Sequence, residues 1–258
     1  MRPYLVILKA EIFALFISPS TYVATFYFLS LLGFGFRFFL ESFSFTDWIL
    51  PPLSSLVIGL LFGSPALIPF ITMRSFAEER RLGTLETLMS APIESFVLVL
   101  GKWSACYLFF LIITCLSFCY PLLVLIIFPE QGINLGFDKI EYWTGGGLFI
   151  LLYGGSFTSI GIFASSVTKN QMVAGMLTFT LLTIYISLMA FSFGETTHES
   201  YNHIYNIIEI GLGNLGNGLK KLEQFSVGLI DIATFFNQSV LIIFFLVLTT
   251  IQVNRLNR

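Results

Sequence analysis

The stretch Met73-Arg-Ser-Phe-Ala-Glu-Glu-Arg-Arg-Leu-Gly-Thr-Leu-Glu-Thr-Leu-Met-Ser-Ala-Pro-Ile93 separates two long apolar segments and sets the limits of both. The segments on either side, residues 54–73 and 96–120, are almost wholly apolar. The hydrocarbon core of a membrane disfavours ionised side chains, so a charged stretch of this density belongs outside it. The stretch therefore predicts a loop that joins two membrane-spanning helices.

The composition of the whole chain agrees with a membrane protein. Of the 258 residues, 56% are hydrophobic and 11% are charged, whereas a soluble domain is usually about 25% charged. A spanning helix needs about 20 apolar residues. We expect an all-α membrane protein with one domain over residues 1–258 and six transmembrane helices. The expected spans are residues 20–40, 54–73, 96–120, 143–166, 171–193 and 233–253.

Two parts of the apolar sequence need a separate interpretation. Residues 2–17 carry Arg2, Lys9 and Glu11 among apolar side chains, which predicts an N-terminal helix lying in the membrane interface. The third apolar run continues to residue 128, which is too long for one span, and Pro121 is expected to break it.

Proline and glycine mark the second and fourth spans. Pro65 and Pro69 predict a kink in the second span, which would be either a hinge or a static packing feature, and we favour static packing. The fourth span is rich in glycine and serine, which predicts a face where helices approach closely.

The positions of the basic residues predict the orientation in the membrane. With the N-terminus inside, nine of the thirteen basic residues lie on the inner side and four on the outer side. We therefore expect both termini in the cytoplasm and outer loops at residues 41–53, 121–142 and 194–232. Arg37 and Glu41, near the outer end of the first span, are expected to form an interfacial pair. The inner set is Arg2, Lys9, Arg74, Arg80, Arg81, Lys102, Lys169, Arg255 and Arg258, and the outer set is Arg37, Lys139, Lys220 and Lys221.

The loop of residues 74–95 has the features of a docking site. Gly83 is suited to end one helix and Thr84 to cap the next. We expect the second span to extend to about Arg81 and a short helix to follow near residues 85–90. Apolar side chains share one face of that helix, and such an amphipathic helix fits a groove of another protein. The alternative, a solvated loop, explains the arginines but not the paired glutamates, the break at Gly83 or the apolar face.

Other kinds of site have less support in the sequence. His198 and His203 are five residues apart, which separates them by about 140° on a helix, so we favour surface histidines over a metal site. The net charge of −2 and the lack of a dense basic patch argue against nucleic acid as a partner. The chain has no Gly-x-x-x-x-Gly-Lys-Ser/Thr loop, so we expect no bound cofactor. No ionisable residue is expected at mid-membrane, which argues against an ion-coupled carrier.

The segment from Phe76 to Ile93 resembles the coupling-loop signature of ABC-2 type transporter permeases. More narrowly, it is similar to the branch that contains permeases of gliding motility and of nitrous-oxide-reductase maturation. Three further segments resemble parts of that branch. Ser18–Val23 resembles the entry into its first span, Gly161–Gln171, followed by Ala174, its turn between the fourth and fifth spans, and Phe225–Asp231 the approach to its last span. The resemblance therefore covers nearly the whole chain.

The resemblance implies a permease subunit of a bacterial exporter in the cytoplasmic (inner) membrane. It implies that ATP and Mg²⁺ are bound by a separate ABC ATPase subunit, that a second copy or a paralogous permease completes the transporter, and that membrane lipid surrounds it. The alternative is a membrane scaffold that binds the ATPase without transport. The residues expected to couple to the ATPase are Phe76, Glu78, Glu79, Arg80, Arg81, Gly83, Thr84, Leu85, Glu86, Leu88 and Met89.

Overall fold

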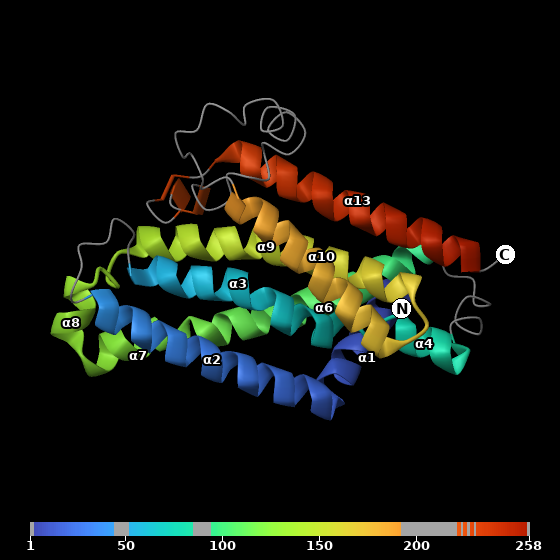
Figure 1. Ribbon diagram of the computed structural model, residues 1–258, viewed down its shortest axis with the longest axis horizontal. Coiled ribbons are helices and arrows are strands. Elements are labelled where there is room, and N and C mark those ends of the chain that lie inside the picture. The colour runs from blue at the N-terminus through green and yellow to red at the C-terminus, as the bar shows by residue number, and fades with distance from the viewer. Residues whose placement is uncertain are drawn as a thin grey trace.

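The computed structural model describes residues 3–43, 52–84, 94–191, 221–222, 224–225, 228–229 and 231–256. Over these residues the regular structure is entirely α-helical (Figure 1). Six helices are long and apolar enough to cross a membrane, which confirms the predicted fold class. The spans are α2 (Pro19–Phe43), α3 (Pro52–Thr72), α6 (Ser95–Ser117), α9 (Ile140–Val167), α10 (Gln171–Phe191) and α13 (Ile232–Leu256).

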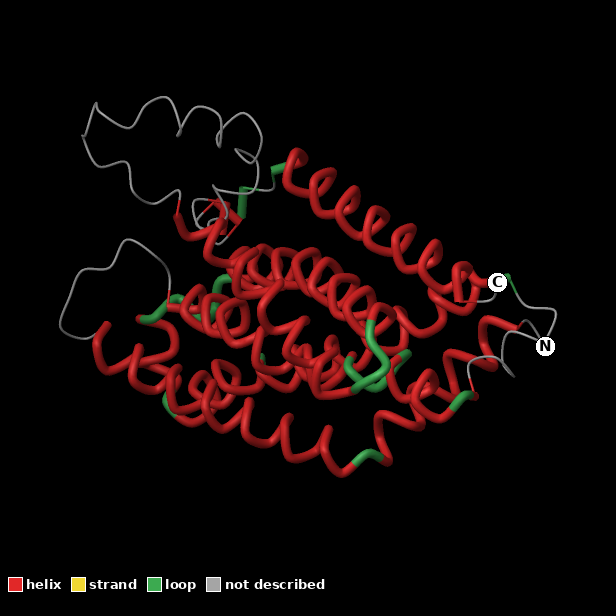
Figure 2. The backbone as a smooth tube through the Cα atoms, turned by 45° about the vertical axis from the view of Figure 1, so that its right-hand side comes forward, coloured by secondary structure: helices red, strands yellow, loops and turns green. Residues whose placement is uncertain are grey.

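Helix α9 lies at the centre of the bundle. It packs against α3, α6, α10 and α13, and the views in Figures 1 and 2 show the long helices running roughly along one axis around it. Within the most apolar window of each span, 72% of the residues of α9 are buried, against 22% in α2 and in α13. The bundle therefore has α9 as its most enclosed helix, with α3 also mostly buried, and two outer helices that leave most of their apolar surface uncovered by this chain.

The glycines of α9 make this enclosure possible, as the sequence predicted. A side chain at Gly154 would place its Cβ 2.2 Å from the ring of Phe110 on α6. At Gly161 the Cβ would lie 2.5 Å from the hydroxyl of Thr72 on α3. Only the smallest residue allows these approaches, so the glycine-rich face of α9 is a packing face.

Helix α3 passes through both of its prolines without ending. Pro65 has no N–H group to donate to the carbonyl of Leu61, four residues earlier. The hydroxyl of Ser64 donates to that carbonyl instead, at 2.6 Å. Both prolines are buried, and this local repair supports the static-packing interpretation over the hinge.

The third apolar run is divided, as predicted, but the outer loop expected at residues 121–142 is more ordered than a loop. Helix α6 ends at Ser117, and α7 (Cys119–Ile127) and α8 (Pro129–Asn134) follow. Pro121 accounts for the position of the break, because its ring would clash with the carbonyl four residues earlier, that of Ser117. The expectation of a plain outer loop was therefore wrong for its first half, since a short apolar run that continues after a proline still forms a helix.

The N-terminal helix α1 (Pro3–Ile17) packs against α6. The hydroxyl of Tyr4 donates to the hydroxyl of Ser104 at 3.0 Å. Gly101 lets α1 approach closely, since a Cβ there would lie 2.9 Å from Ile7 Cγ2. Whether α1 also lies in the membrane interface stays a prediction.

The two ends of the bundle differ in what they carry. Both chain termini, α4 and the turn at residues 168–170 lie at one end, and α7 and α8 lie at the other (Figure 1). At the α7–α8 end, Arg37 Nε donates to Glu41 Oε1 at 3.1 Å, with side chains 79% and 62% exposed, which confirms the predicted pair.

The last span begins with a side-chain cap at the same end. Asp231 Oδ2 accepts a hydrogen bond from the Thr234 hydroxyl at 2.7 Å, and Oδ1 accepts one from the Ala233 N–H at 3.0 Å. The hydrogen bond from Thr234 is the main reason why the pKa of the Asp231 carboxyl lies below its ordinary value. Asp231 thus fixes where α13 starts.

Candidate docking site after the second span

The chain leaves α3 through a turn at residues 73–76 and then forms α4 (Ala77–Leu82). We call residues 73–84 the docking segment. Glu78 and Glu79 occupy the first turn of α4 and Arg80 and Arg81 the last. This order of charges complements the helix dipole. A helix of six residues needs such help, because it has few internal hydrogen bonds.

Gly83 ends α4 in the way that the sequence predicted. Its backbone is left-handed, with φ 73°, and its N–H donates to the carbonyl of Glu79. The hydroxyl of Thr84 also donates to that carbonyl, at 3.4 Å. In the described part of the chain Thr84 therefore contacts the helix before it. Its predicted role as the cap of a following helix concerns residues 85–90, which lie outside the described residues.

The second span continues to Leu82, close to the expected end at Arg81, but a turn at residues 73–76 divides it into α3 and α4, and Ser165 on α9 binds this turn. The backbone N–H groups of Phe76 and Ala77 donate to the hydroxyl of Ser165 at 3.1 and 3.2 Å. That hydroxyl donates in turn to the carbonyl of Met73 at 3.2 Å. In a continuous helix the two N–H groups would bond to carbonyls four residues earlier. The side chain of another helix thus takes over the hydrogen bonds that would join α3 to α4.

A second contact fixes the end of α4 to the end of α9. Arg80 Nη1 donates to the carbonyl of Ser166 at 2.6 Å and to that of Thr168 at 3.3 Å. These carbonyls belong to the last residues of α9 and its C-cap. A guanidinium group is well suited to bind free carbonyls at a helix C-terminus. Arg80 therefore ties the docking segment to the turn between the fourth and fifth spans.

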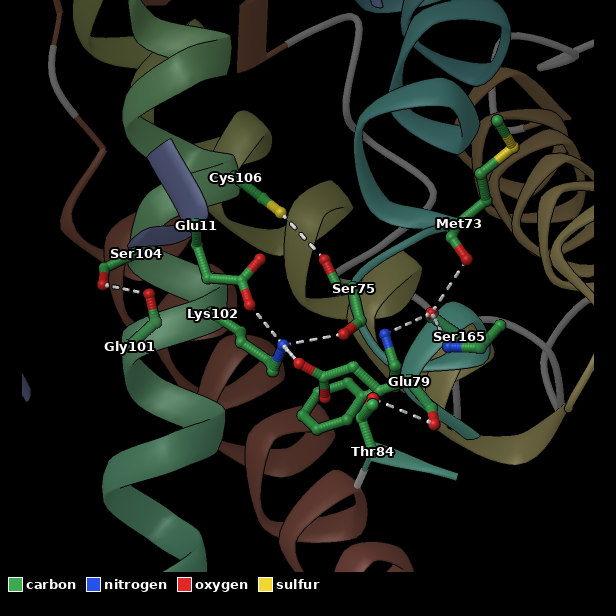
Figure 3. Close-up of polar contacts among 12 residues, drawn as sticks. Glu11, Met73, Ser75, Glu79, Thr84, Gly101, Lys102, Ser104, Cys106 and Ser165 are labelled. Atoms are coloured by element: carbon green, nitrogen blue, oxygen red, sulfur yellow. Dashed lines mark hydrogen bonds and ion pairs between the residues drawn. The ribbon is translucent and has the colours of Figure 1, made fainter. Parts of the chain in front are cut away.

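Lys102 on α6 holds the docking segment from the other side (Figure 3). Its side chain is 1% exposed. The ammonium donates to Glu11 Oε1, to the carbonyl of Ser75 at 2.8 Å and to Glu79 Oε1 at 2.7 Å. It also lies 5.1 Å from the ring centroid of Phe76. All three donors of the ammonium are thus used, and the acceptors come from α1, from the turn at 73–76 and from α4.

Arg74 makes a further contact within the same end of the bundle. Its guanidinium binds Glu78 through two hydrogen bonds, Nε to Oε2 at 2.7 Å and Nη2 to Oε1 at 3.1 Å. It also donates to the hydroxyl of Ser18, at the junction of α1 and α2. Next to these groups lies a cavity lined by residues of α1, α3 and the docking segment, among them Glu11, Ser18 and Glu79.

The residues predicted to couple to an ATPase fall into three sets. Phe76 is fully buried, and Glu78, Glu79 and Arg80 are partly buried and bonded within the chain. Arg81, Gly83 and Thr84 are exposed, together with Leu82. The remaining four predicted residues, Leu85, Glu86, Leu88 and Met89, lie outside the described residues.

Sequence reasoning missed Lys102, Glu11 and Ser165 as parts of this site. Lys102 lies seven residues into α6, about 10 Å along the helix axis. A signal was present, because a lysine in one apolar helix and a glutamate in another both need a partner. Ser165 gave no comparable signal, since serine is ordinary in a closely packed membrane helix.

The described residues contain no group of three His, Cys, Asp or Glu side chains that could hold a metal ion. His198 and His203, the histidines considered for a metal site, lie outside the described residues. The expectations about metals and cofactors therefore stay predictions.

Comparison with known proteins identifies the family. The family model described as ABC-2 family transporter protein matches residues 16–251. A search of curated proteins found no match. Because the family model covers nearly the whole chain, the protein belongs to the ABC-2 transporter family, as the resemblance of its loop predicted. It is a multi-pass membrane protein, the permease component of an ABC system.

Proposed function

We propose that this ABC-2 permease binds a separate ATPase subunit through residues 74–95 and uses its ATP hydrolysis to export a substrate. The chain supplies the spans and the docking segment, and the partner supplies ATP and Mg²⁺ binding. The sequence contains no phosphate-binding loop of the Gly-x-x-x-x-Gly-Lys-Ser/Thr type, which supports this division.

The observation that carries the proposal is the way the docking segment is attached. It follows α3 directly, Ser165 and Ser166 on α9 bond to it, and Lys102 on α6 bonds to it. Rigid helices transmit a displacement when they share such contacts. A force applied to residues 73–84 would therefore act on three spans together, which is what coupling to an ATPase requires.

The charge distribution supports a cytoplasmic position for this end of the bundle. Arg74, Arg80, Arg81, Lys169 and the last turn of α13 with Arg255 lie at the end that carries both termini. Arg37 and Lys139 lie in the part of the chain near α7 and α8, at the opposite end. Basic residues favour the cytoplasmic side, so we place both termini and the docking segment in the cytoplasm of a bacterial cell.

The exposed part of the docking segment supports direct contact with a partner. Arg81, Leu82, Gly83 and Thr84 are exposed at its end, and Leu82 is 62% exposed. The sequence that follows, Leu85-Glu-Thr-Leu-Met89, carries the apolar face predicted to enter a groove of the ATPase. A second permease copy or a paralogous permease, also expected, would cover part of the apolar surface that α2 or α13 leaves exposed.

The test of docking is a pull-down in mild detergent from the native membrane, followed by identification of the proteins that come with the chain. We expect an ATPase subunit with the unchanged chain, and loss of most of it with Leu85→Glu or Glu86→Lys. Asn134→Lys, an exposed substitution on α8, is the matched control and should retain the ATPase. Unchanged recovery of the ATPase with both loop variants would contradict docking at this segment.

Permease and scaffold differ in what the complex does after docking. For a permease, the rate of ATP hydrolysis by the reconstituted complex depends on the permease, and a transport substrate stimulates it. For a scaffold, the ATPase binds equally well but hydrolyses ATP at the rate of the free subunit. The second result would replace the transport proposal by the scaffold.

The topology has its own test in intact cells, with Cys106, Cys115 and Cys119 replaced. A cysteine at position 169, Lys169→Cys, should not react with an impermeant thiol reagent added outside. The control Lys139→Cys should react. Labelling of position 169 from outside would reverse the proposed orientation.

A further inference from the structure

We propose that Lys102 is a positioning residue that joins the N-terminal helix α1 and the docking segment to α6 as one unit. A displacement of the docking segment would then move α1 with it. This inference rests on the proposed function in one respect: the ATPase would be the source of the displacement.

The geometry of the ammonium is the first support. Glu11 belongs to α1, Ser75 to the turn after α3 and Glu79 to α4, and all three accept hydrogen bonds from Lys102 Nζ. The sequence separations from Lys102 are 91, 27 and 23 residues. In Figure 3 the two carboxylates approach the ammonium from different elements and meet at it. The side chain of Lys102 therefore joins α1 and the docking segment, both of which lie more than 20 residues away from it in the sequence.

The attachment of α1 is the second support. Apart from Glu11, its contacts described above are with α6, through Tyr4 to Ser104 and through the close approach of Ile7 to Gly101. These contacts fix α1 to α6, and Glu11 extends the connection to the docking segment through the shared ammonium. The bond from Arg74 to Ser18 adds a second link, at the end of α1.

The energetics are the third support. Two carboxylates share one ammonium, and Glu79 Oε2 is buried without a hydrogen-bond partner among the described residues. Desolvating charged groups is costly, and apolar residues of similar size often fill such a site at no loss of stability. Packing alone would thus be served as well by apolar side chains. The retained charges fix a geometry between three elements, which is the role that we assign to them.

The test compares the unchanged junction with one in which all three charges are removed, by Lys102→Met with Glu11→Gln and Glu79→Gln. The triple variant leaves no uncompensated buried charge, so it is expected to fold. Lys102→Arg, which keeps the charge, is the conservative control. Spin labels at Phe13 on α1 and Leu82 on α4, both exposed, report the distance between the two segments in a background without native cysteines. Because Leu82 lies in the surface proposed to contact the ATPase, the ATPase arm uses a labelled chain that retains the ATPase in the pull-down.

Without the ATPase, we expect one narrow distance distribution between the labels for the unchanged chain and a broad or shifted one for the triple variant. The single variant Lys102→Arg, which keeps the charge, should retain the narrow distance distribution of the unchanged chain. With the ATPase and trapped nucleotide, α1 and α4 should keep their mutual distance in the unchanged chain and lose it in the triple variant. The same narrow distribution in the triple variant, with and without the ATPase, would overturn the proposal.

The two proposals fail differently in this experiment. If no ATPase binds the unchanged chain, the proposed function fails, and the measurement on the chain alone still decides whether Lys102 joins α1 to the docking segment. If the ATPase binds and the triple variant behaves as the unchanged chain does, docking stands and the positioning role of Lys102 is refuted. A folded triple variant with normal stability also separates positioning from a merely structural role.

Discussion

The ion pair Arg37–Glu41 and the junction around Lys102 use the same chemistry at the two ends of one bundle. Arg37 and Glu41 are one helical turn apart on a single helix, and both are mostly exposed. Lys102 is buried, and its partners come from three other elements. An exposed pair is screened by water and contributes little, whereas a buried ammonium must keep its partners or leave charges uncompensated. The charges around Lys102 therefore bear on the tertiary structure, and the Arg37–Glu41 pair hardly does.

The largest difference between the two ends should follow from Lys102→Met alone. The substitution leaves two carboxylates without their cation, which costs about 3–5 kcal/mol. The free energy of unfolding, measured by denaturant titration in mixed micelles, should fall by that order. Arg37→Met is the matched control and should leave it almost unchanged. Equal losses at the two positions would refute the contrast between the ends.

A smaller effect is expected from Ser165→Ala, which tests the docking end without changing a charge. The N–H groups of Phe76 and Ala77 lose their acceptor, and an unsatisfied buried group costs about 1–3 kcal/mol. Amide hydrogen exchange in residues 73–82 should rise. Ser159→Ala is the control, because the hydroxyl of Ser159 bonds to the carbonyl of Ser156 on its own helix. Similar exchange in both variants would show that Ser165 does not hold the segment.

The cap of α13 gives an intermediate case, a carboxylate that is hydrogen-bonded and partly buried. Asp231→Ala should lower the free energy of unfolding by about 1 kcal/mol at neutral pH. The pKa of this carboxyl is lowered in the folded chain, chiefly by Thr234. Its stabilisation is therefore present above the ordinary Asp pKa and is lost as the pH falls through the lowered value.

The control for this pH dependence is Asp231→Asn, which keeps a capping side chain that does not titrate. The unfolding free energy of the unchanged chain, relative to this variant, should fall as the pH drops through the lowered pKa. A difference between the two chains that stays constant over that pH range would contradict the carboxylate as its origin.

The smallest effect should come from Arg37→Ala. The pair is exposed on both sides, so the melting temperature should not change measurably at physiological salt. At low ionic strength, where the pair is screened less, the same substitution should lower the melting temperature by a small measurable amount. A loss as large as that of Lys102→Met would mean that this end carries a tertiary contact that the described residues do not show.

Most of the fold was predictable, because a membrane-spanning helix can be recognised directly from its apolar sequence. Each span is a run of about 20 apolar residues between polar stretches. The six spanning helices α2, α3, α6, α9, α10 and α13 follow those runs. Two local predictions were also confirmed: the helix breaks near Pro121, and Gly83 ends α4 in a left-handed conformation. These features depend on the residues within one or two turns.

The interior of the docking site was not predictable in the same way. Residues 74–81 favour a continuous helix, and the groups that bind the turn dividing it come from other helices, with Ser165 about 90 positions later in the chain. The partners of Lys102 likewise depend on how α1 packs against α6. The spacing of apolar residues within either helix does not determine this packing. Contacts between distant elements decided the site, whereas local apolar runs decided the spans.

The order of residues in the junction bears on how the protein enters the membrane during synthesis. Glu11, Ser75 and Glu79 all precede Lys102 in the chain, so every acceptor of the ammonium leaves the ribosome before the lysine does. The first half of the chain thus contains every group that accepts a hydrogen bond from the Lys102 ammonium. Insertion of α6 need not wait for the last three spans, and the central helix α9 arrives after the Lys102 ammonium has all its acceptors.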